Sequence, residues 1–233
     1  MNNFRAKIYR SIIAFIAIVI LAAANGCGQD TVTPQADNLD FSAMSTGDSV
    51  GNNIGILVLD TVKILIKDIK LNVANANQDS SNFKVGPFVL YLNMVSNVNI
   101  ISTGFIPAGT YDKVRFMVHK LENSEPVPDP DFEDINGRYS VVVKGRYSGI
   151  SFVFKSDKSA HQKLTFPGNL QVSASGKSNI TMHVKPYIWF IKNGIYLDPA
   201  VPANLNDIEN NIKDNINNNF KIFVDNDRNG QPD

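Results

Sequence analysis

Residues 54–73 read IGILVLDTVKILIKDIKLNV, and this stretch decides the class of fold. The run 54–59 is almost wholly apolar, which is typical of a strand that is buried on both faces. From Val62 onward apolar side chains alternate largely with lysines, which is the two-residue period of a strand. The alternation shifts by one residue at Lys67–Asp68. Because such a shift would turn the apolar set toward water, we predict a β-bulge near Asp68.

The same alternation recurs along the chain and predicts a mainly β protein. Further strands are expected at 85–92, 98–101, 113–119, 139–144, 150–155, 164–166, 170–173 and 179–185. Turn residues separate these runs, and the Asn- and Ser-rich segment 75–82 is expected to be a loop. Many short strands with turns between them predict an antiparallel β-sandwich.

The last part of the chain has a different period and predicts an amphipathic helix. Its apolar residues recur every three or four positions: Leu205, Ile208, Ile212, Ile216 and Phe220. Asn204 is the expected N-cap. The polar face is mostly Asn and has few basic residues, so we expect the helix to pack on the core and not on a membrane surface.

The first residues have the three parts of a bacterial export signal. Arg5, Lys7 and Arg10 precede the apolar run 12–24, and the segment ends at Gly26-Cys27. The apolar run is shorter than the ~20 residues that a membrane-spanning helix needs. We therefore expect the rest of the chain to be exported from the cytoplasm.

Cys27 is the only cysteine of the chain, and its position resembles the lipidation site of bacterial lipoproteins. In that family the cysteine thiol is lipidated and becomes the new N-terminus, so the resemblance implies a lipid anchor and an outer-membrane location. Gly26 fits the pattern, whereas the expected Leu three residues before the cysteine is missing and Leu21 is the nearest one. The alternative is an ordinary signal peptide that is cut near Ala24 or Gly26.

The chain then divides into three further parts. Residues 28–53 are rich in small and polar residues and predict a flexible tether. We expect the β-sandwich domain at 54–192 and a C-terminal extension at 193–233.

Without the signal the formal charge changes from zero to minus three, which excludes the clustered basic face of a nucleic-acid-binding protein.

Two segments concentrate acidic residues. Residues 122–136, called the acidic segment below, contain three prolines and several acids, and predict either a solvated connector or the rim of a cation or ligand site. Residues 225–233, called the C-terminal loop, read DNDRNGQPD.

The C-terminal loop matches the first three quarters of an EF-hand calcium loop, because oxygen side chains stand at positions one, three, five and nine and glycine stands at six. The candidate calcium ligands are Asp225, Asp227, Asn229, Gln231 and Asp233. Position twelve lies beyond Asp233, so a terminal carboxylate or an acid from elsewhere would have to complete the shell. The alternative is a solvated acidic tail.

No catalytic residues are predicted, and we expect the protein not to be an enzyme. His119, His161 and His183 do not have the spacing of metal ligands. The chain has neither a Gly-rich phosphate loop nor a Gly-x-Ser-x-Gly motif. A pair of carboxylates of the glycosidase type stays open, but no two acids stand out.

Two stretches resemble the bacterial lipoprotein family called domain of unknown function 4382. They are VKILIKDIKL at 62–71 and IPAGTYDKVRF at 106–116, with its Pro-Ala-Gly-Thr-Tyr turn. The resemblance covers 54–192 and implies a β-sandwich of transthyretin-like or carbohydrate-binding-like type at the cell envelope, without assigned catalytic residues. The same turn resembles that of fimbrial subunits of anaerobic bacteria.

Together these observations predict a lipid-anchored envelope protein with a non-catalytic binding module for a polysaccharide or another envelope protein. The alternative is a fimbrillin-like structural subunit of a surface fibre, and a hydrolase is the third hypothesis. Tyr147, Tyr187 and Trp189 are expected in the core or on a sugar-stacking surface.

Overall fold

The computed structural model describes residues 36–46, 56–74, 81–92, 94 and 97–233, so the predicted signal peptide and Cys27 lie outside the described residues. The main strands are β1 (Leu39–Ser45), β2 (Leu57–Val73), β3 (Ser81–Val85), β4 (Phe88–Leu92), β5 (Asn99–Gly104), β6 (Gly109–Val118), β9 (Val141–Tyr147), β10 (Ile150–Ser156), β11 (Ala160–Val172), β12 (Ser178–Val184) and β15 (Lys221–Val224). Shorter elements are β7 (Glu133–Asp134), β8 (Gly137–Arg138), β13 (Ile191–Lys192), β14 (Ile195–Tyr196), the 3-10 helices η1 (Pro130–Phe132) and η2 (Pro186–Phe190), and the helix α2 (Pro202–Asn218).

The strand β2 organises the larger sheet, as the sequence predicted. It runs for 17 residues and pairs with β9 and β4 in its first half and with β6 and β3 in its second half. Its register against β6 shifts between Ile66 and Asp68, which confirms the predicted bulge. Gly86 lies against this bulge, where a Cβ atom would stand 2.3 Å from the carbonyl oxygen of Lys67. The backbone approach therefore requires glycine at this position.

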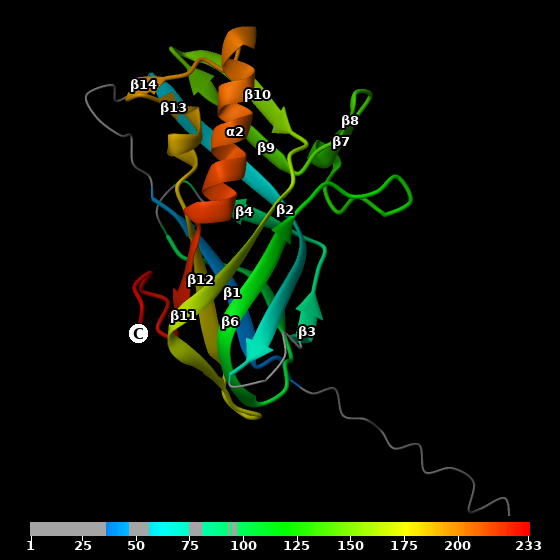
Figure 1. Cartoon of the computed structure of the whole chain (residues 1–233), viewed down its shortest axis with the longest axis vertical. Coiled ribbons are helices and arrows are strands. Elements are labelled where there is room, and N and C mark those ends of the chain that lie inside the picture. The colour runs from blue at the N-terminus through cyan, green and yellow to red at the C-terminus, as the bar shows by residue number, and fades with distance from the viewer. Residues whose placement is uncertain (1–35, 47–55, 75–80, 93, 95–96) are drawn as a thin grey trace, which may run out of the picture. The chain divides into compact units, whose positions relative to one another are not determined.

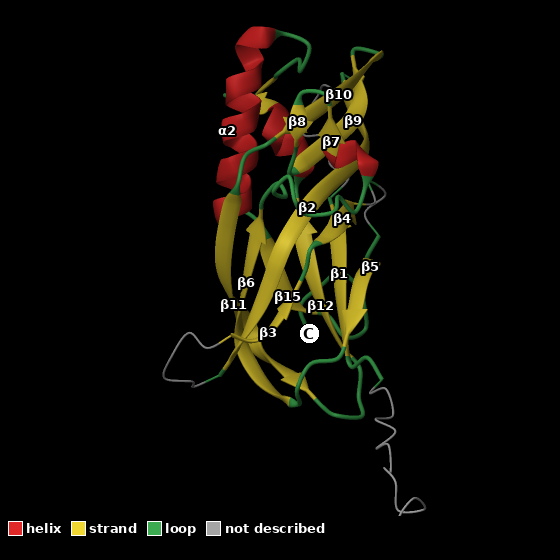
Figure 2. Ribbon diagram, turned by 90° about the vertical axis from the view of Figure 1, so that its right-hand side faces the viewer, coloured by secondary structure: helices red, strands yellow, loops and turns green. Residues whose placement is uncertain are grey.

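Two sheets form the sandwich (Figure 2). The larger has the order β10-β9-β2-β6-β11 with β3 and β4 also paired to β2, and the smaller has the order β15-β12-β1-β5. The predicted mainly β sandwich with a C-terminal helix is confirmed. One pair departs from the antiparallel expectation, since β1 and β12 run parallel.

The strand β1 corrects the predicted tether. Residues 39–45 fall within 28–53 but form a buried strand between β12 and β5. Leu39, Phe41 and Ala43 face the core and alternate with Asp40 and Ser42, and all five are buried. The composition of 28–53 as a whole hid this short alternation, because polar residues flank it on both sides.

The extension predicted at 193–233 is part of the same compact unit, which spans 36–233. The strand β15 pairs with β12, and α2 packs against β11 and η2 (Figure 1). The buried face of α2 includes Ile208, Ile212 and Ile216, which confirms the predicted periodicity. The helix begins earlier than predicted, at Pro202, and Asn204 is not its cap. Its amide instead donates to the Asp198 carbonyl oxygen at 3.0 Å.

The acidic segment is exposed along most of its length, as expected of a surface connector, but it is anchored to the sheet at one point. Phe132 is 1% exposed and forms a second apolar cluster with Leu65, Leu121 and Val142. This cluster gives the segment a fixed position on the sheet, which its acids then reinforce through the ion pairs described below.

Candidate functional site

The C-terminal loop follows β15 and folds back on the smaller sheet. The Asp233 N–H donates to the Val224 carbonyl oxygen at 3.0 Å and so brings the two ends of the loop together. Gly230 has a φ of +81° and lies against Met44 of β1 and against Val98, where a Cβ atom would stand 3.1 Å from the Met44 sulfur. The positive φ therefore favours glycine at loop position six, and a Cβ atom there would press on the Met44 side chain.

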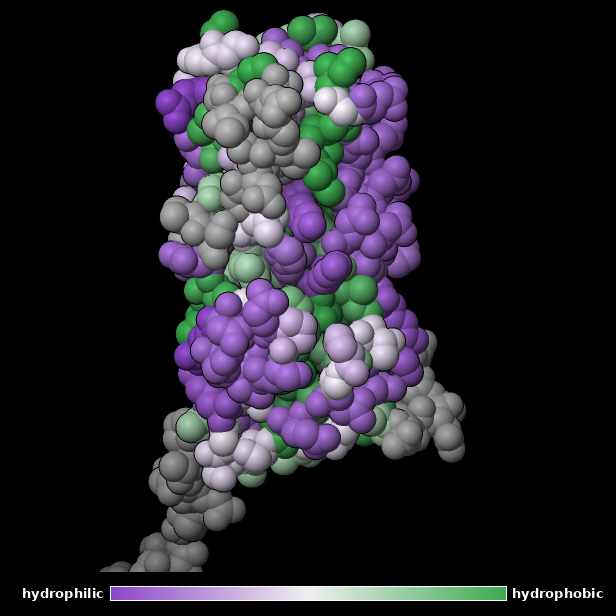
Figure 3. All heavy atoms as spheres, turned by 90° about the vertical axis from the view of Figure 1, so that its left-hand side faces the viewer, coloured by the Kyte–Doolittle hydropathy of each residue, from purple (hydrophilic) through white to green (hydrophobic). Residues whose placement is uncertain are grey.

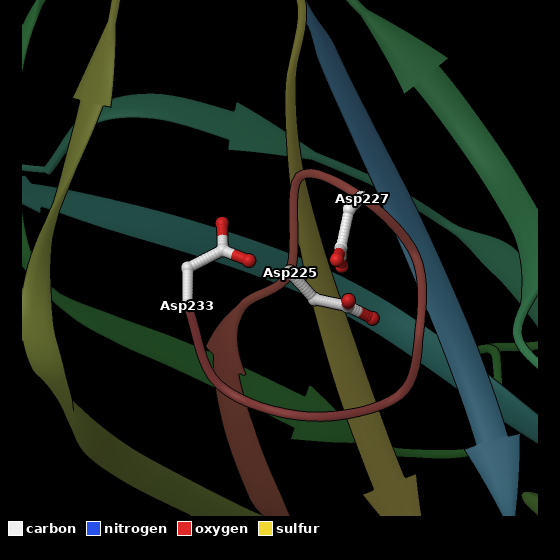
Figure 4. A group of neighbouring side chains, drawn as sticks. All are labelled: Asp225, Asp227 and Asp233. Carbon is white, nitrogen blue, oxygen red and sulfur yellow. The ribbon is translucent and has the colours of Figure 1, made fainter.

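Three of the five predicted ligands lie together. Asp225, Asp227 and Asp233 each offer a carboxylate oxygen, and these oxygens all lie within 4.8 Å of one another. Figure 4 shows Asp225 and Asp227 pointing into the ring that the C-terminal loop makes, with Asp233 at its open side. Their sequence positions are one, three and nine of the predicted loop.

Asp225 is fully buried and hydrogen-bonded to neutral groups. Its carboxylate accepts from the Thr181 hydroxyl at 2.6 Å and from the Gly230 N–H at 3.3 Å. The Asn179 amide donates to the Asp225 carbonyl oxygen at 2.7 Å. A buried carboxylate is costly unless its charge is balanced, so its position favours a cation at this point.

The other predicted ligands are held by short-range turns. The Asn229 N–H donates to Asp227 Oδ1 at 3.2 Å, and the Gln231 N–H donates to Asn229 Oδ1 at 2.7 Å. Asp233 Oδ2 accepts from the Asn226 N–H at 2.8 Å. Asn229 and Gln231 are exposed, and within the loop Gln231 contributes its backbone N–H.

Basic side chains do not neutralise this cluster. Within the described part of the chain, no Lys or Arg forms an ion pair with any of the three carboxylates. Arg228, although it belongs to the loop, pairs instead with the fully buried Asp40. Lys177 lies 2.9 Å from the other Asp40 oxygen, as an ion pair without hydrogen-bond geometry. A hard cation with oxygen ligands, such as Ca²⁺, suits the charge and the donor atoms that remain.

A buried polar row beneath the loop was not predicted. Ser42, Asn179 and Thr181 lie on the face of the smaller sheet that points away from the core, yet each is at most 1% exposed. The Ser42 hydroxyl donates to Asn179 Oδ1 at 2.6 Å, and the Asn179 amide donates to the Thr181 hydroxyl at 3.1 Å. Strand alternation placed Thr181 toward solvent, whereas in the structure its hydroxyl donates to Asp225 Oδ2 of the returning loop at 2.6 Å.

The acidic segment does not offer a cation site of the same kind, because lysines and arginines occupy its carboxylates. Lys63 lies 2.7 Å from Asp129 and 2.8 Å from Asp131, and Lys144 lies 2.7 Å from Asp131. The hydrogen bonds from Lys144 and then from Lys63 lower the pKa of Asp131. Three other carboxylates of the segment also form ion pairs: Lys67–Glu125, Arg138–Glu133 and Lys155–Asp134.

The aromatic residues considered for sugar stacking do not form a surface. Trp189 is fully buried in the core, while Tyr147 and Tyr187 are half-buried. The Tyr147 hydroxyl donates to the Tyr196 carbonyl oxygen at 3.3 Å, which uses its polar end within the protein. Core packing, the other alternative, is therefore the role of Trp189.

None of the helices in the described ranges is both long and apolar enough to cross a membrane. A scan against protein-family models finds no match for the chain, a search of curated proteins finds none, and a search of solved structures finds none. The resemblance to the domain of unknown function 4382 family therefore stays a prediction from residues 62–71 and 106–116.

Proposed function

We propose that this protein is a non-catalytic binding module of the bacterial cell envelope whose C-terminal loop binds calcium. The module is carried at the outer membrane by a lipid on Cys27, and its ligand is a polysaccharide or another envelope protein. The observation that supports the calcium site best is the buried Asp225 carboxylate beside Asp227 and Asp233 without a compensating Lys or Arg in the described residues.

Calcium titration by calorimetry tests the site directly. We expect a dissociation constant of about 0.1–1 mM, the range of extracellular calcium modules. Asp227→Asn should abolish the heat of binding, because it removes an exposed ligand charge without emptying the core. Asp129→Asn in the acidic segment is the matched control and should leave calcium binding unchanged. No heat from wild-type protein up to about 10 mM calcium would contradict the proposal.

The lipid anchor has its own test. Cys27→Ser should move the protein from the membrane fraction to the soluble fraction, since it removes the thiol that the lipid would modify. Metabolic labelling with a fatty acid should mark wild-type protein and not the variant. A serine variant that partitions into membranes like the wild type would contradict a lipid on Cys27.

A second candidate, a structural subunit of a surface fibre, is favoured by one edge of the larger sheet. Among the described strands β10 pairs with β9 alone, and it exposes 74% of Ile150 and 60% of Val153. Lys155 is the one charged residue on β10, and it is paired with Asp134 at 2.7 Å. It is therefore not a free charge that would oppose pairing of this edge with another chain. Sedimentation should then show association that Val153→Lys abolishes, and a strictly monomeric wild type would contradict this candidate.

A further inference from the structure

Two hollows lie along the seam where β11 meets β15 and the C-terminal loop. One holds about 440 Å³ and the other about 230 Å³, and both are lined by Pro167, Phe223 and Pro232. Figure 1 shows β11 beside β15 at this seam. Figure 3 faces the side of the molecule on which Figure 1 marks the C-terminus and shows hydrophobic atoms between hydrophilic ones. We call the two hollows together the seam groove, and its size is that of a small-molecule site.

Both amides and apolar residues line the seam groove. Phe220 and Leu164 are among the apolar residues that line the larger hollow. The amide residues are Gln162 and Asn218 in the larger hollow and Asn169, Gln171 and Asn226 in the smaller one. Side-chain amides offer both a donor and an acceptor, which suits hydroxyl groups, and the rings of proline and phenylalanine offer flat apolar contact.

Gln162 supplies an independent sign that a ligand belongs here. Its side chain lines the larger hollow, is 8% exposed, and has an Oε1 atom that accepts no hydrogen bond within the described residues. A buried acceptor without a donor destabilises the fold, so such atoms are rare in folded proteins. Gln162 Oε1 is itself closed to solvent, so the amide would have to turn toward the hollow for a ligand hydroxyl to supply the missing donor.

The strand edges at the groove favour a sugar over an extended peptide. A peptide would bind by adding a strand, for which the edge of β11 would have to present regular N–H and C=O groups. Pro167 has no N–H, and the register of β11 against β6 shifts between Thr165 and Leu170. Because the edge is interrupted where the two hollows meet, recognition falls to the side chains.

The C-terminal loop forms one wall of the groove. Asn226, Pro232 and Asp233 line the smaller hollow, and Asp233 also belongs to the carboxylate cluster. Asp233 Oδ2 accepts from the Asn226 amide at 2.7 Å, so the residues of this wall are linked to one another. A cation bound by Asp225, Asp227 and Asp233 would fix the same wall.

From these observations we propose that the seam groove binds a neutral, hydroxyl-rich oligosaccharide, and that calcium in the C-terminal loop holds one wall of this site in place. The inference rests on the proposed binding role and names the ligand class and its position. Gln162 accepts from a sugar hydroxyl, Asn169 and Gln171 bind further hydroxyls, and Pro167 and Pro232 contact the sugar ring.

The test measures the binding of maltohexaose, cellohexaose, laminarihexaose, xylohexaose and chitohexaose to the full chain, with calcium and with a chelator. We expect at least one of them to bind with calcium and to bind about tenfold more weakly with the chelator, which corresponds to about 1.4 kcal/mol. Gln162→Leu and the double variant Asn169→Ala/Gln171→Ala should each weaken binding about five- to tenfold. Asn206→Ala, an exposed amide on α2, is the matched control and should bind as wild type does.

Thermal unfolding of Gln162→Leu separates binding from folding. Replacing an unpaired buried amide by an apolar side chain is close to neutral or stabilising, so weaker sugar binding without lower stability supports the role of Gln162. Calcium binding without retention of any hexasaccharide would overturn the seam groove and leave the calcium proposal standing. If both groove variants bind the sugar as the wild type does, the sugar site does not lie in the seam groove. If the sugar binds equally tightly with calcium and with the chelator, calcium does not contribute to the sugar site.

Discussion

The acidic segment and the C-terminal loop have similar compositions and opposite electrostatic surroundings. In the acidic segment, Asp129 and Asp131 share the ammonium group of Lys63 from the middle of β2. In the C-terminal loop, Asp225 and its two neighbours have hydrogen bonds from neutral groups and, across the described ranges, no ion pair. A row of aspartates therefore indicates a cation site only when the rest of the fold leaves its charge unbalanced.

The two loops are also attached to the sheets in different ways. An apolar anchor, Phe132, fixes the acidic segment, and its ion pairs surround that anchor. The C-terminal loop is fixed by Gly230 against Met44 and by a buried polar row. In the acidic segment the protein's own lysines and arginines balance the paired carboxylates. In the C-terminal loop a bound cation would balance the carboxylates and would stabilise the loop conformation.

The largest expected effect comes from removing the anchor of the acidic segment. Phe132→Ala should lower the free energy of unfolding by about 3–5 kcal/mol, the usual cost of emptying a buried aromatic site. Ile135→Ala is the control, because Ile135 is 100% exposed and its loss should cost less than about 0.5 kcal/mol. Denaturant unfolding measures both, and equal values would mean that Phe132 does not anchor the segment.

Calcium should stabilise the protein through the C-terminal loop alone. At a hundredfold excess over the dissociation constant it should add about 2.7 kcal/mol, because it binds the native state. For a domain of this size that is about 5–10 °C in midpoint. Asp227→Asn should remove the shift while Asp129→Asn keeps it. A shift that both variants keep would show that calcium acts elsewhere.

Breaking the shared ion pair should have a smaller effect. Lys63→Met keeps the apolar stem but leaves Asp129 and Asp131 without the ammonium group of Lys63, at a cost of about 1–3 kcal/mol. Lys120→Met removes an exposed pair with Asp157 and should cost less than about 1 kcal/mol. Chemical denaturation compares the two variants. A Lys63→Met variant as stable as Lys120→Met would show that the ion pairs of Lys63 stabilise the acidic segment no more than an exposed surface pair does.

The smallest effect concerns pH and the paired acids. The hydrogen bond from Lys155, with those from the Tyr139 hydroxyl and the Asn136 N–H, lowers the pKa of Asp134 to about 2. Since this pKa is below the unfolded value, the carboxylate stabilises the fold above about pH 4, and this contribution is lost as the pH falls toward 2. Lys155→Met should raise the pKa and reduce the loss in that range. A carboxyl titration by NMR checks the pKa, and an unchanged value would contradict the role of Lys155.

Residues 54–73 predicted the central strand and its bulge correctly, because a two-residue period and a one-residue slip are local properties of the sequence. The strands predicted at 139–144 and 150–155 were equally local, and they form the hairpin of β9 and β10 with positive φ values at Ser148 and Gly149. The buried face of α2 followed from its period in the same way. The strand β1 was missed, because seven residues of alternation inside a polar stretch give a weak signal.

What the sequence by itself determined are the periodicities: the mainly β class, the amphipathic helix and the order of oxygen side chains from Asp225 to Asp233. The tertiary structure alone decided which acids have partners. Lys63 meets Asp129 across 66 positions and Arg228 meets Asp40 across 188, and nothing local in the sequence encodes such distances. The physical reason is that strand pairing and sheet packing bring distant charges together, and these contacts decide whether a carboxylate is balanced by the protein or is left for a cation.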